Sequence, residues 1–155
     1  MSLERVKQYL EQSGLESRMT VYPGTIDTVE HAAEMAGCER GRVAKTMSFL
    51  VNGCPVLIVL SGDVKIDNAK FKNHFRVKAQ MIPFEHVGEL IGYMPGGVCP
   101  YAVNDGVKTY LDVSLKRFPD VHTGGGSETC LVHLTIEELE AQAKSCGWID
   151  VCKEI

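Results

Sequence analysis

Lys45 lies in a stretch that has the pattern of a β-strand, and its position there suggests a chemical role. Residues 44–51 are rich in β-branched and aromatic side chains and end at Asn52-Gly53. Because strand side chains alternate in direction, Lys45 shares one face with Met47, Phe49 and Val51. An ammonium group among apolar neighbours needs water, a carboxylate or an anionic ligand. The sequence therefore leaves three interpretations of Lys45: it extends into water, it is ion-paired, or it binds an anion at the mouth of a pocket.

Two glycine-rich segments, residues 92–100 and 123–127, are the second candidate for chemistry. Glycine allows the backbone to approach a ligand closely and to present N–H groups to an anion or oxyanion. Pro95 and Pro100 restrict the backbone near both ends of the first segment, as a preformed site requires. Ordinary tight turns explain either segment alone. Neither segment has a phosphate-binding Walker pattern or a dinucleotide fingerprint, which argues against a nucleotide hydrolase or a dehydrogenase.

Length and composition predict one globular domain over residues 1–155. The chain has 155 residues, of which 45% are hydrophobic and 23% charged, the usual proportions for a soluble domain with a single core. No apolar run approaches the length of a membrane span, and neither a secretory signal nor a lipid anchor is visible. We therefore expect a cytoplasmic protein that has no membrane partner.

The net charge of −4 gives the chain no general nucleic-acid-binding character. One region differs, because five basic residues between positions 65 and 78 stand against the single acid Asp67. These five are Lys65, Lys70, Lys72, Arg76 and Lys78. The basic region is typical of a solvated helix face, but it also suits contact with a phosphate backbone.

The six cysteines include no Cys-x-x-Cys pair, so we expect reduced and mostly buried thiols. A zinc site can be drawn from Cys130, His133, Cys146 and Cys152, but their spacing fits no standard pattern. We expect no metal and no cofactor.

Hydrophobic periodicity and capping residues predict a mixture of helices and strands. The expected helices are 2–13, 29–36, 68–75, 83–91 and one that begins at the capping box 135–138. The expected strands are 19–22, 44–51, 56–60, 77–81, 107–113 and 130–134, with 123–127 as a flexible stretch. Because strand and helix do not alternate strictly, the predicted fold class is α/β, a single domain with a mixed central β-sheet flanked by helices.

Four stretches of the chain resemble the YbaK/prolyl-tRNA-synthetase editing-domain family. They are residues 25–33, 43–46, 92–100 and 123–125, and the likeness extends from about Val6 to Leu139. Members of that family hydrolyse the ester between a wrong amino acid and tRNA. The resemblance implies a free-standing aminoacyl-tRNA deacylase with the editing-domain fold, acting on tRNA(Pro) that carries a small wrong amino acid. Its implied partners are the acceptor end of the tRNA and prolyl-tRNA synthetase.

The resemblance also implies residue roles. Lys45 matches the lysine that holds the phosphate or terminal adenosine of the substrate, and residues 96–100 match the loop that contacts the ester and places the water. The implied catalytic residues are Lys45, Gly96, Gly97 and Pro100. The implied substrate-binding residues are Tyr22, Thr46, Val98, Cys99, His122, Thr123, Gly124 and Gly125. Members that resemble the cysteine-specific proteins carry an Asp shortly after the second segment, where this chain has residues 130–133, Cys-Leu-Val-His. The amino acid removed is therefore open.

Two alternatives remain at this point. Cys99 lies in a Gly/Pro segment where a thiolate can be stabilised, so a thiol hydrolase with His122 or His86 as the base is one of them. A tRNA- or synthetase-binding module of the same fold without hydrolysis is the other. A catalytic triad is not required for an activated ester, because an oriented water and backbone N–H groups supply much of the acceleration. We expect His31, His74 and His133 to have packing or surface roles.

Overall fold

A mixed seven-stranded β-sheet forms the centre of the computed structural model, which describes residues 2–155. Its strand order is β1-β7-β6-β2-β3-β5-β8, and β4 pairs with β9 in a separate two-stranded sheet. The strands are β1 Met19–Val21, β2 Val43–Val51, β3 Cys54–Ser61, β4 Val64–Ile66, β5 Lys108–Asp112, β6 Asp120–Gly124, β7 Cys130–Thr135, β8 Trp148–Ile149 and β9 Cys152–Glu154. Both parallel and antiparallel pairs occur, which confirms the predicted α/β class with a mixed sheet.

Residues 2–155 contain five α-helices, and side chains cap the starts of three of them. The five helices are α1 Ser2–Glu11, α2 Val29–Ala36, α3 Asn68–Phe75, α4 Val87–Ile91 and α5 Ile136–Gln142. Thr28 accepts a hydrogen bond from the His31 N–H, Asp67 accepts from two N–H groups of α3, and Thr135 and Glu138 form the predicted capping box. None of the helices in residues 2–155 has the length and hydropathy that a membrane span requires.

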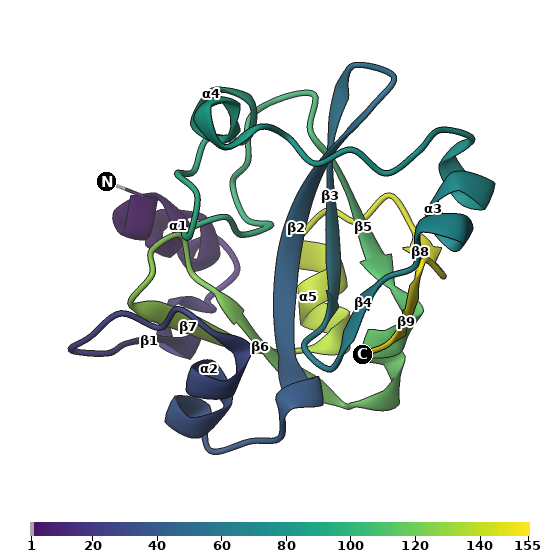
Figure 1. Cartoon of the computed structure of the whole chain (residues 1–155). Helices are drawn as coiled ribbons and strands as arrows, with labels where there is room; N and C mark the ends of the chain where they lie inside the picture. Colours follow the sequence, from purple (N-terminus) through teal and green to yellow (C-terminus); the bar gives the residue numbers. More distant parts are fainter. Residues whose placement is uncertain (1) are drawn as a thin grey trace.

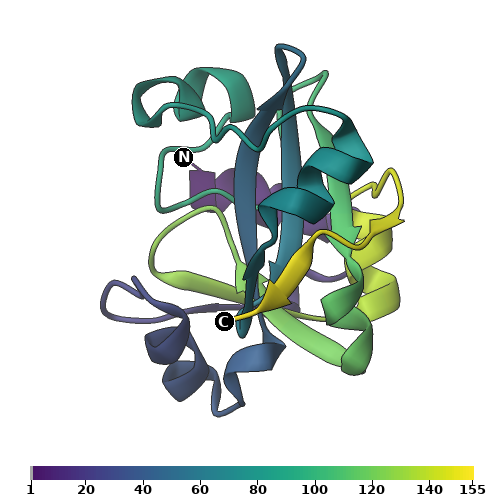
Figure 2. The same cartoon turned by 45° about the vertical axis from the view of Figure 1, so that its right-hand side comes forward.

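Different elements cover the two faces of the sheet (Figures 1 and 2). On one face, α1, α5 and the segment after α4 enclose a core that includes Leu10, Leu57 and Tyr101. On the other face, α3 and the β4–β9 pair enclose a second core around Phe49 and Phe71. Strand β2 contributes to both cores, so alternate side chains of this one strand point to different surroundings.

The β2–β3 hairpin has the two-residue turn that its sequence predicts. Asn52 and Gly53 adopt φ values of 52° and 79°, and positive φ at both positions is typical of a type I′ turn. The hairpin register extends from Val51 opposite Cys54 to Ala44 opposite Ser61. On its other edge, β2 pairs in parallel with β6 only at Val43 and Ala44. The two strands then separate, and this separation positions the candidate site.

Two predictions about strands were wrong. Residues 77–81 do not form a strand, and only Met81 makes an isolated bridge, to Phe49. Residues 123 and 124 belong to β6 rather than to a flexible stretch, because β6 lies between β2 and β7 and buries Val121 and Thr123. The short strands β4, β8 and β9 were also not predicted, since tertiary pairing and not local pattern defines them.

Candidate functional site

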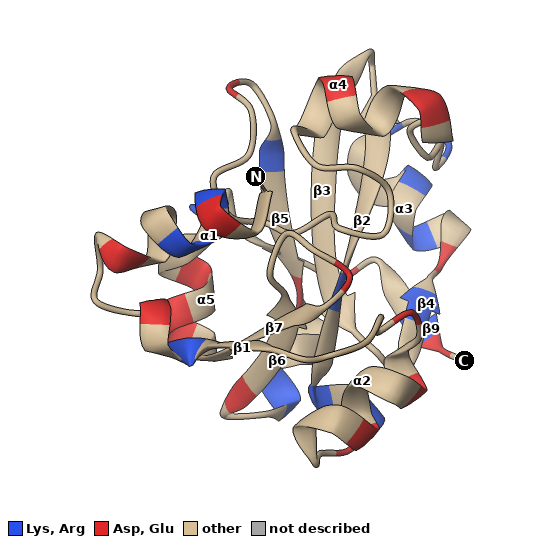
Figure 3. Ribbon diagram, turned by 90° about the vertical axis from the view of Figure 1, so that its left-hand side faces the viewer, with Lys and Arg blue, Asp and Glu red and all other residues tan. Residues whose placement is uncertain are grey.

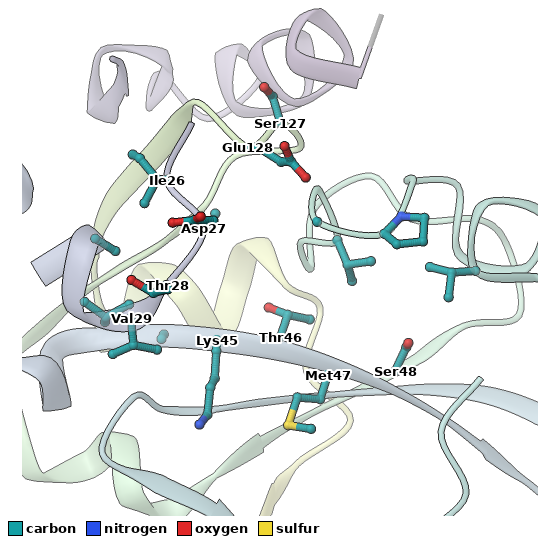
Figure 4. A pocket seen from close by; sticks show the side chains of 18 of the residues that line it. Ile26, Asp27, Thr28, Val29, Lys45, Thr46, Met47, Ser48, Ser127 and Glu128 are labelled. Atoms are coloured by element: carbon teal, nitrogen blue, oxygen red, sulfur yellow. The ribbon is translucent and has the colours of Figure 1, made fainter. Parts of the chain in front are cut away.

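A pocket with a volume of about 580 Å³ lies where β2 and β6 separate. Its walls come from four regions: β2 residues 43–48, residues 26–29 at the start of α2, residues 81–87, and the glycine-rich segments. Figure 4 shows Ser127 and Glu128 across the pocket from Thr46 and Ser48. Segments distant in the sequence therefore meet at one hollow beside an open strand edge.

The floor of the pocket is a stretch of β2 whose outer edge lacks a neighbouring strand. The β2–β6 register ends with Ala44 opposite Thr123. The next backbone partner on this edge is at Ser48, whose carbonyl accepts from the Ile82 N–H at 3.1 Å. Thr46 lies between these two points and has the same orientation as Ala44 and Ser48, since alternate residues of a strand point their N–H and C=O groups to the same side. The Thr46 amide therefore faces the pocket.

The two glycine-rich segments contact each other through their backbones. A β-carbon at Gly97 would lie 2.9 Å from the Gly126 carbonyl oxygen, a distance that side chains do not tolerate. Gly96 adopts a φ of 90°, which favours glycine. The structure therefore requires glycine at both positions to bring residues 95–98 against residues 124–128.

Buried tyrosines fix the first segment to β6. The Tyr93 hydroxyl donates to the Tyr101 carbonyl, and the Tyr101 hydroxyl lies 2.8 Å from the Thr123 hydroxyl. Burial raises the pKa of both phenols, so these groups remain neutral hydrogen-bonding groups. Thr123 itself is fully buried. The pocket wall at residues 95–98 is thus held by an internal polar network.

Lys45 lines the pocket and is half-buried, but its side chain leaves β2 on the side opposite to Thr46 and Ser48 (Figure 4). Burial lowers the pKa of the Lys45 ammonium, Cys152 acts in the opposite direction, and Arg40 lowers it further. Among residues 2–155 the ammonium has no ion-pair partner. Lys45 therefore places a partly desolvated positive charge beside the pocket, across β2 from the glycine-rich segments.

The structure brings five of the twelve predicted site residues to the pocket surface: Lys45, Thr46, Gly96, Val98 and Gly124. The other seven lie behind or beside it: Tyr22, Gly97, Cys99, Pro100, His122, Thr123 and Gly125.

Thr123 is hydrogen-bonded to Tyr101, and Tyr22 and His122 are also occupied by other contacts. The Tyr22 hydroxyl lies 3.5 Å from the Met35 carbonyl oxygen. The His122 ring stacks on His133 with ring centroids 4.2 Å apart, and burial followed by the neighbouring His133 lowers its pKa.

Sequence reasoning missed two carboxylates and two exposed apolar side chains that line the pocket. Asp27 and Glu128 are the carboxylates. Met81 and Phe84 are 52% and 74% exposed although they line the pocket. Glu128 directly follows the second glycine-rich segment, and this adjacency is the signal that could have found it.

Cys99 does not have the surroundings of a nucleophile. Its side chain is fully buried, and burial raises the pKa of its thiol to about 12, whereas a reactive cysteine needs an accessible thiolate. The proposed bases also lie elsewhere, since His122 stacks on His133 and His86 is exposed beside Glu89. The geometry therefore disfavours a thiol mechanism.

The residues drawn as a zinc site do not assemble. Cys130 lies on β7 and Cys152 on β9, which belong to different sheets. Within residues 2–155, no three His, Cys, Asp or Glu side chains converge in a metal-binding group.

The basic region lies on β4, on α3 and just after α3, outside the pocket lining, and Lys70 and Lys72 are its two residues on α3 (Figure 3). Lys70 on this helix pairs with Asp150 at 3.1 Å and donates to the Cys152 carbonyl oxygen at 2.9 Å. Part of the basic region is therefore committed to holding α3 against the end of the chain.

Comparison with known proteins agrees with this fold. Residues 24–141 match the aminoacyl-tRNA editing domain family, and the chain belongs to this family. It is 43% identical over 155 residues to the uncharacterized protein YwhH of Bacillus subtilis, with 99% of each chain covered. It is 26% identical over 114 residues, 72% of this chain and 70% of the relative, to EbsC of Enterococcus faecalis, provisionally assigned as a Cys-tRNA(Pro)/Cys-tRNA(Cys) deacylase.

A crystal structure of a protein provisionally assigned as a trans-editing enzyme for prolyl tRNA synthetase superimposes with a TM-score of 0.89. Its sequence is 29% identical, and the match covers 98% of this chain and 97% of that one. The similarity thus includes the whole architecture and not only the pocket segments.

Proposed function

We propose that this chain is a cytoplasmic aminoacyl-tRNA deacylase whose residues 1–155 act as one editing domain. Its proposed substrate is tRNA(Pro) that carries a small wrong amino acid, and prolyl-tRNA synthetase is a proposed partner. Support comes from the editing-domain family and from relatives and structural neighbours assigned to prolyl-tRNA editing. The observation that carries the proposal is the pocket between the open edge of β2 and two glycine-rich segments in contact.

Hydrolysis requires the ester carbonyl to be held beside donors and a water molecule. The water oxygen attacks the carbonyl carbon, the bond from that carbon to the ribose oxygen breaks, and the ribose oxygen receives a proton. The Gly97 N–H already donates to the Met94 carbonyl, so the proposed oxyanion donors in this segment are the N–H groups of Gly96 and Val98. Gly97 and Pro100 then act by fixing the shape of the segment.

The two sides of β2 suit the two parts of this substrate. The aminoacyl ester enters between Thr46 and residues 95–98, and the Lys45 ammonium on the other side of the strand binds the phosphate of the tRNA end. Met81 and Phe84 are exposed at the pocket, where a nucleobase can stack on the Phe84 ring and pack against Met81. The proposed binding role of His122 and Tyr22 is indirect, through the position of β6 and of the segment before α2.

The test is multiple-turnover hydrolysis of alanyl-, seryl-, threonyl- and cysteinyl-tRNA(Pro), with correctly charged prolyl-tRNA(Pro) as the control. We expect the enzyme to release at least one wrong amino acid through many cycles and to spare proline. Repeating the assay with prolyl-tRNA synthetase present measures the partnership. Stoichiometric binding of these tRNAs without turnover would instead establish the non-catalytic binding module.

A further inference from the structure

Glu128 is a pocket carboxylate with no assigned role. It lines the pocket, and Figure 4 shows its side chain across the pocket from Thr46. Within residues 2–155 its carboxylate takes part in no ion pair and no side-chain hydrogen bond, unlike Glu138, which binds Arg18 at 2.7 Å. A carboxylate that lacks a partner at a binding pocket is available for a positively charged ligand group.

The backbone at Gly96 gives the Glu128 side chain its position. A β-carbon at Gly96 would lie 2.1 Å from Oε1 of Glu128 and 3.0 Å from its Cδ atom. The side chain of Glu128 therefore crosses the space that any other residue at position 96 would fill. This contact places the carboxylate next to the segment that we propose to hold the ester.

The charged groups at the pocket are arranged to complement those of the proposed substrate: a cation lies on one side of β2 and a carboxylate on the other. The Lys45 ammonium lies on the side of β2 that faces away from Thr46, whereas Glu128 lies across the pocket from Thr46 (Figure 4). An aminoacyl-tRNA carries a phosphate on one side of its ester and an α-ammonium group on the other. If Lys45 binds the phosphate, the α-ammonium points toward the glycine-rich segments and Glu128.

Asp27, the other carboxylate of the pocket, has different surroundings. Its side chain is 74% exposed and lies 3.7 Å from the His31 ring, one turn further along the chain. Asp27 and Glu128 are both exposed to solvent, which screens their charges, but Asp27 also has His31 beside it, which competes for its carboxylate. Asp27 is therefore the natural comparison for Glu128.

We propose that Glu128 binds the α-ammonium group of the aminoacyl ester and so selects aminoacyl over other acyl esters. This inference rests on the proposed deacylase function. It assigns Glu128 to substrate binding and not to activation of water.

The test compares two esters that differ only at the α-position. The first is whichever of alanyl-, seryl-, threonyl- and cysteinyl-tRNA(Pro) the wild-type protein hydrolyses fastest, and the second is the same ester with its α-amino group converted to hydroxyl. We expect Glu128→Gln to lower kcat/KM for the aminoacyl ester roughly tenfold, the effect of losing one charge-assisted hydrogen bond, and to leave the hydroxyacyl ester unchanged. Glu128→Asp keeps the charge and should retain part of the preference.

Two controls make the result specific. Glu137→Gln changes the same chemical group at an exposed position of α5, away from the pocket, and Asp27→Asn removes the other pocket carboxylate. Both variants should keep the wild-type ratio of kcat/KM for the aminoacyl ester to kcat/KM for the hydroxyacyl ester. A ratio that collapses in Asp27→Asn but not in Glu128→Gln would overturn the assignment.

Failure of the inference can be told apart from failure of the proposed function. Equal losses on both esters in Glu128→Gln, with unchanged thermal unfolding, would show that Glu128 acts on the water and would overturn only the inference. If the wild-type protein hydrolyses none of these esters, the deacylase proposal fails and this inference fails with it.

Discussion

The two sides of β2 present polar groups to the candidate site in different ways. On the side of Thr46, the groups belong to the backbone or to segments fixed by buried hydrogen bonds, such as the Tyr101–Thr123 pair. On the other side, Lys45 is a half-buried cation with no ion-pair partner in residues 2–155. The difference suggests that reaction geometry depends on the rigid side, which is the side of Thr46, and that capture of the tRNA end depends on Lys45.

Removal of the Lys45 charge should have the largest effect on activity. Lys45→Ala is expected to lower kcat/KM for a mischarged tRNA roughly 100-fold, because a charge-assisted contact with phosphate is lost. Circular dichroism should show an unchanged fold, since the ammonium makes no ion pair within the described residues. Lys72→Ala on α3 is the matched control, and wild-type activity in Lys45→Ala would refute the proposed role.

A change on the rigid side should instead affect stability first. Thr123→Val keeps the shape of the side chain but leaves the fully buried Tyr101 hydroxyl without its partner. We expect the free energy of unfolding to fall by about 1–3 kcal/mol, together with a lower kcat as the segment loosens. Thr20→Val on the edge strand β1 is the control, and denaturant unfolding is the measurement. An equally large loss in Thr20→Val would show that the buried pair is not special.

Cys99 should matter for packing and little for chemistry. Cys99→Ala is expected to change kcat less than about threefold and to cost roughly 1 kcal/mol of stability through the small cavity it leaves. Turnover assays beside thermal unfolding separate the two effects. Abolished turnover in a fully folded variant would restore the thiol mechanism that the burial of Cys99 disfavours.

The smallest expected effect is a pH dependence of stability. Burial lowers the pKa of Lys45 below its ordinary 10.5, so in the range between the lowered pKa and 10.5 the unfolded chain binds more protons than the folded protein. The contribution of Lys45 to stability therefore increases with pH across that range. Lys45→Met should flatten this part of the profile, as measured by urea unfolding at several alkaline pH values. A profile identical to that of the wild type would show that the ammonium is fully hydrated.

Local signals in the sequence were sufficient for the elements they specify. The Asn52-Gly53 turn and the Thr135 capping box depend on residues adjacent in the chain, and both occur as predicted. Strand β6 was missed because it becomes a strand through pairing with β2 and β7. The strand predicted at residues 77–81 was wrong for the opposite reason. The segment has an alternating pattern, but no neighbouring strand pairs along its length, so only one bridge forms, between Met81 and Phe49.

The parts of the candidate site that contain the glycine-rich segments and Lys45 could be predicted from the sequence. The parts that depend on how the segments are oriented around β2 could not. Alternation along β2 correctly placed Lys45 with Met47 and Phe49, which pack toward the second core. It could not show that the glycine-rich segments cover the other face of that strand. Glu128 has no motif, and its position depends on a contact with Gly96 that only the folded chain creates.

The short β2–β6 ladder has a consequence for the range of acyl groups that can be accommodated. The pocket begins where the β2–β6 pairing ends, at Ala44 and Thr123. The separation of the two strands beyond this pair therefore sets the width of the pocket there. Substitutions of the lining side chains can change the space for the acyl group by the size of one or two methyl groups. One further pair of residues between β2 and β6 would instead close the pocket at this end. Relatives with larger or smaller amino acids as targets are therefore expected to differ in the length of the chain between Gly124 and Cys130.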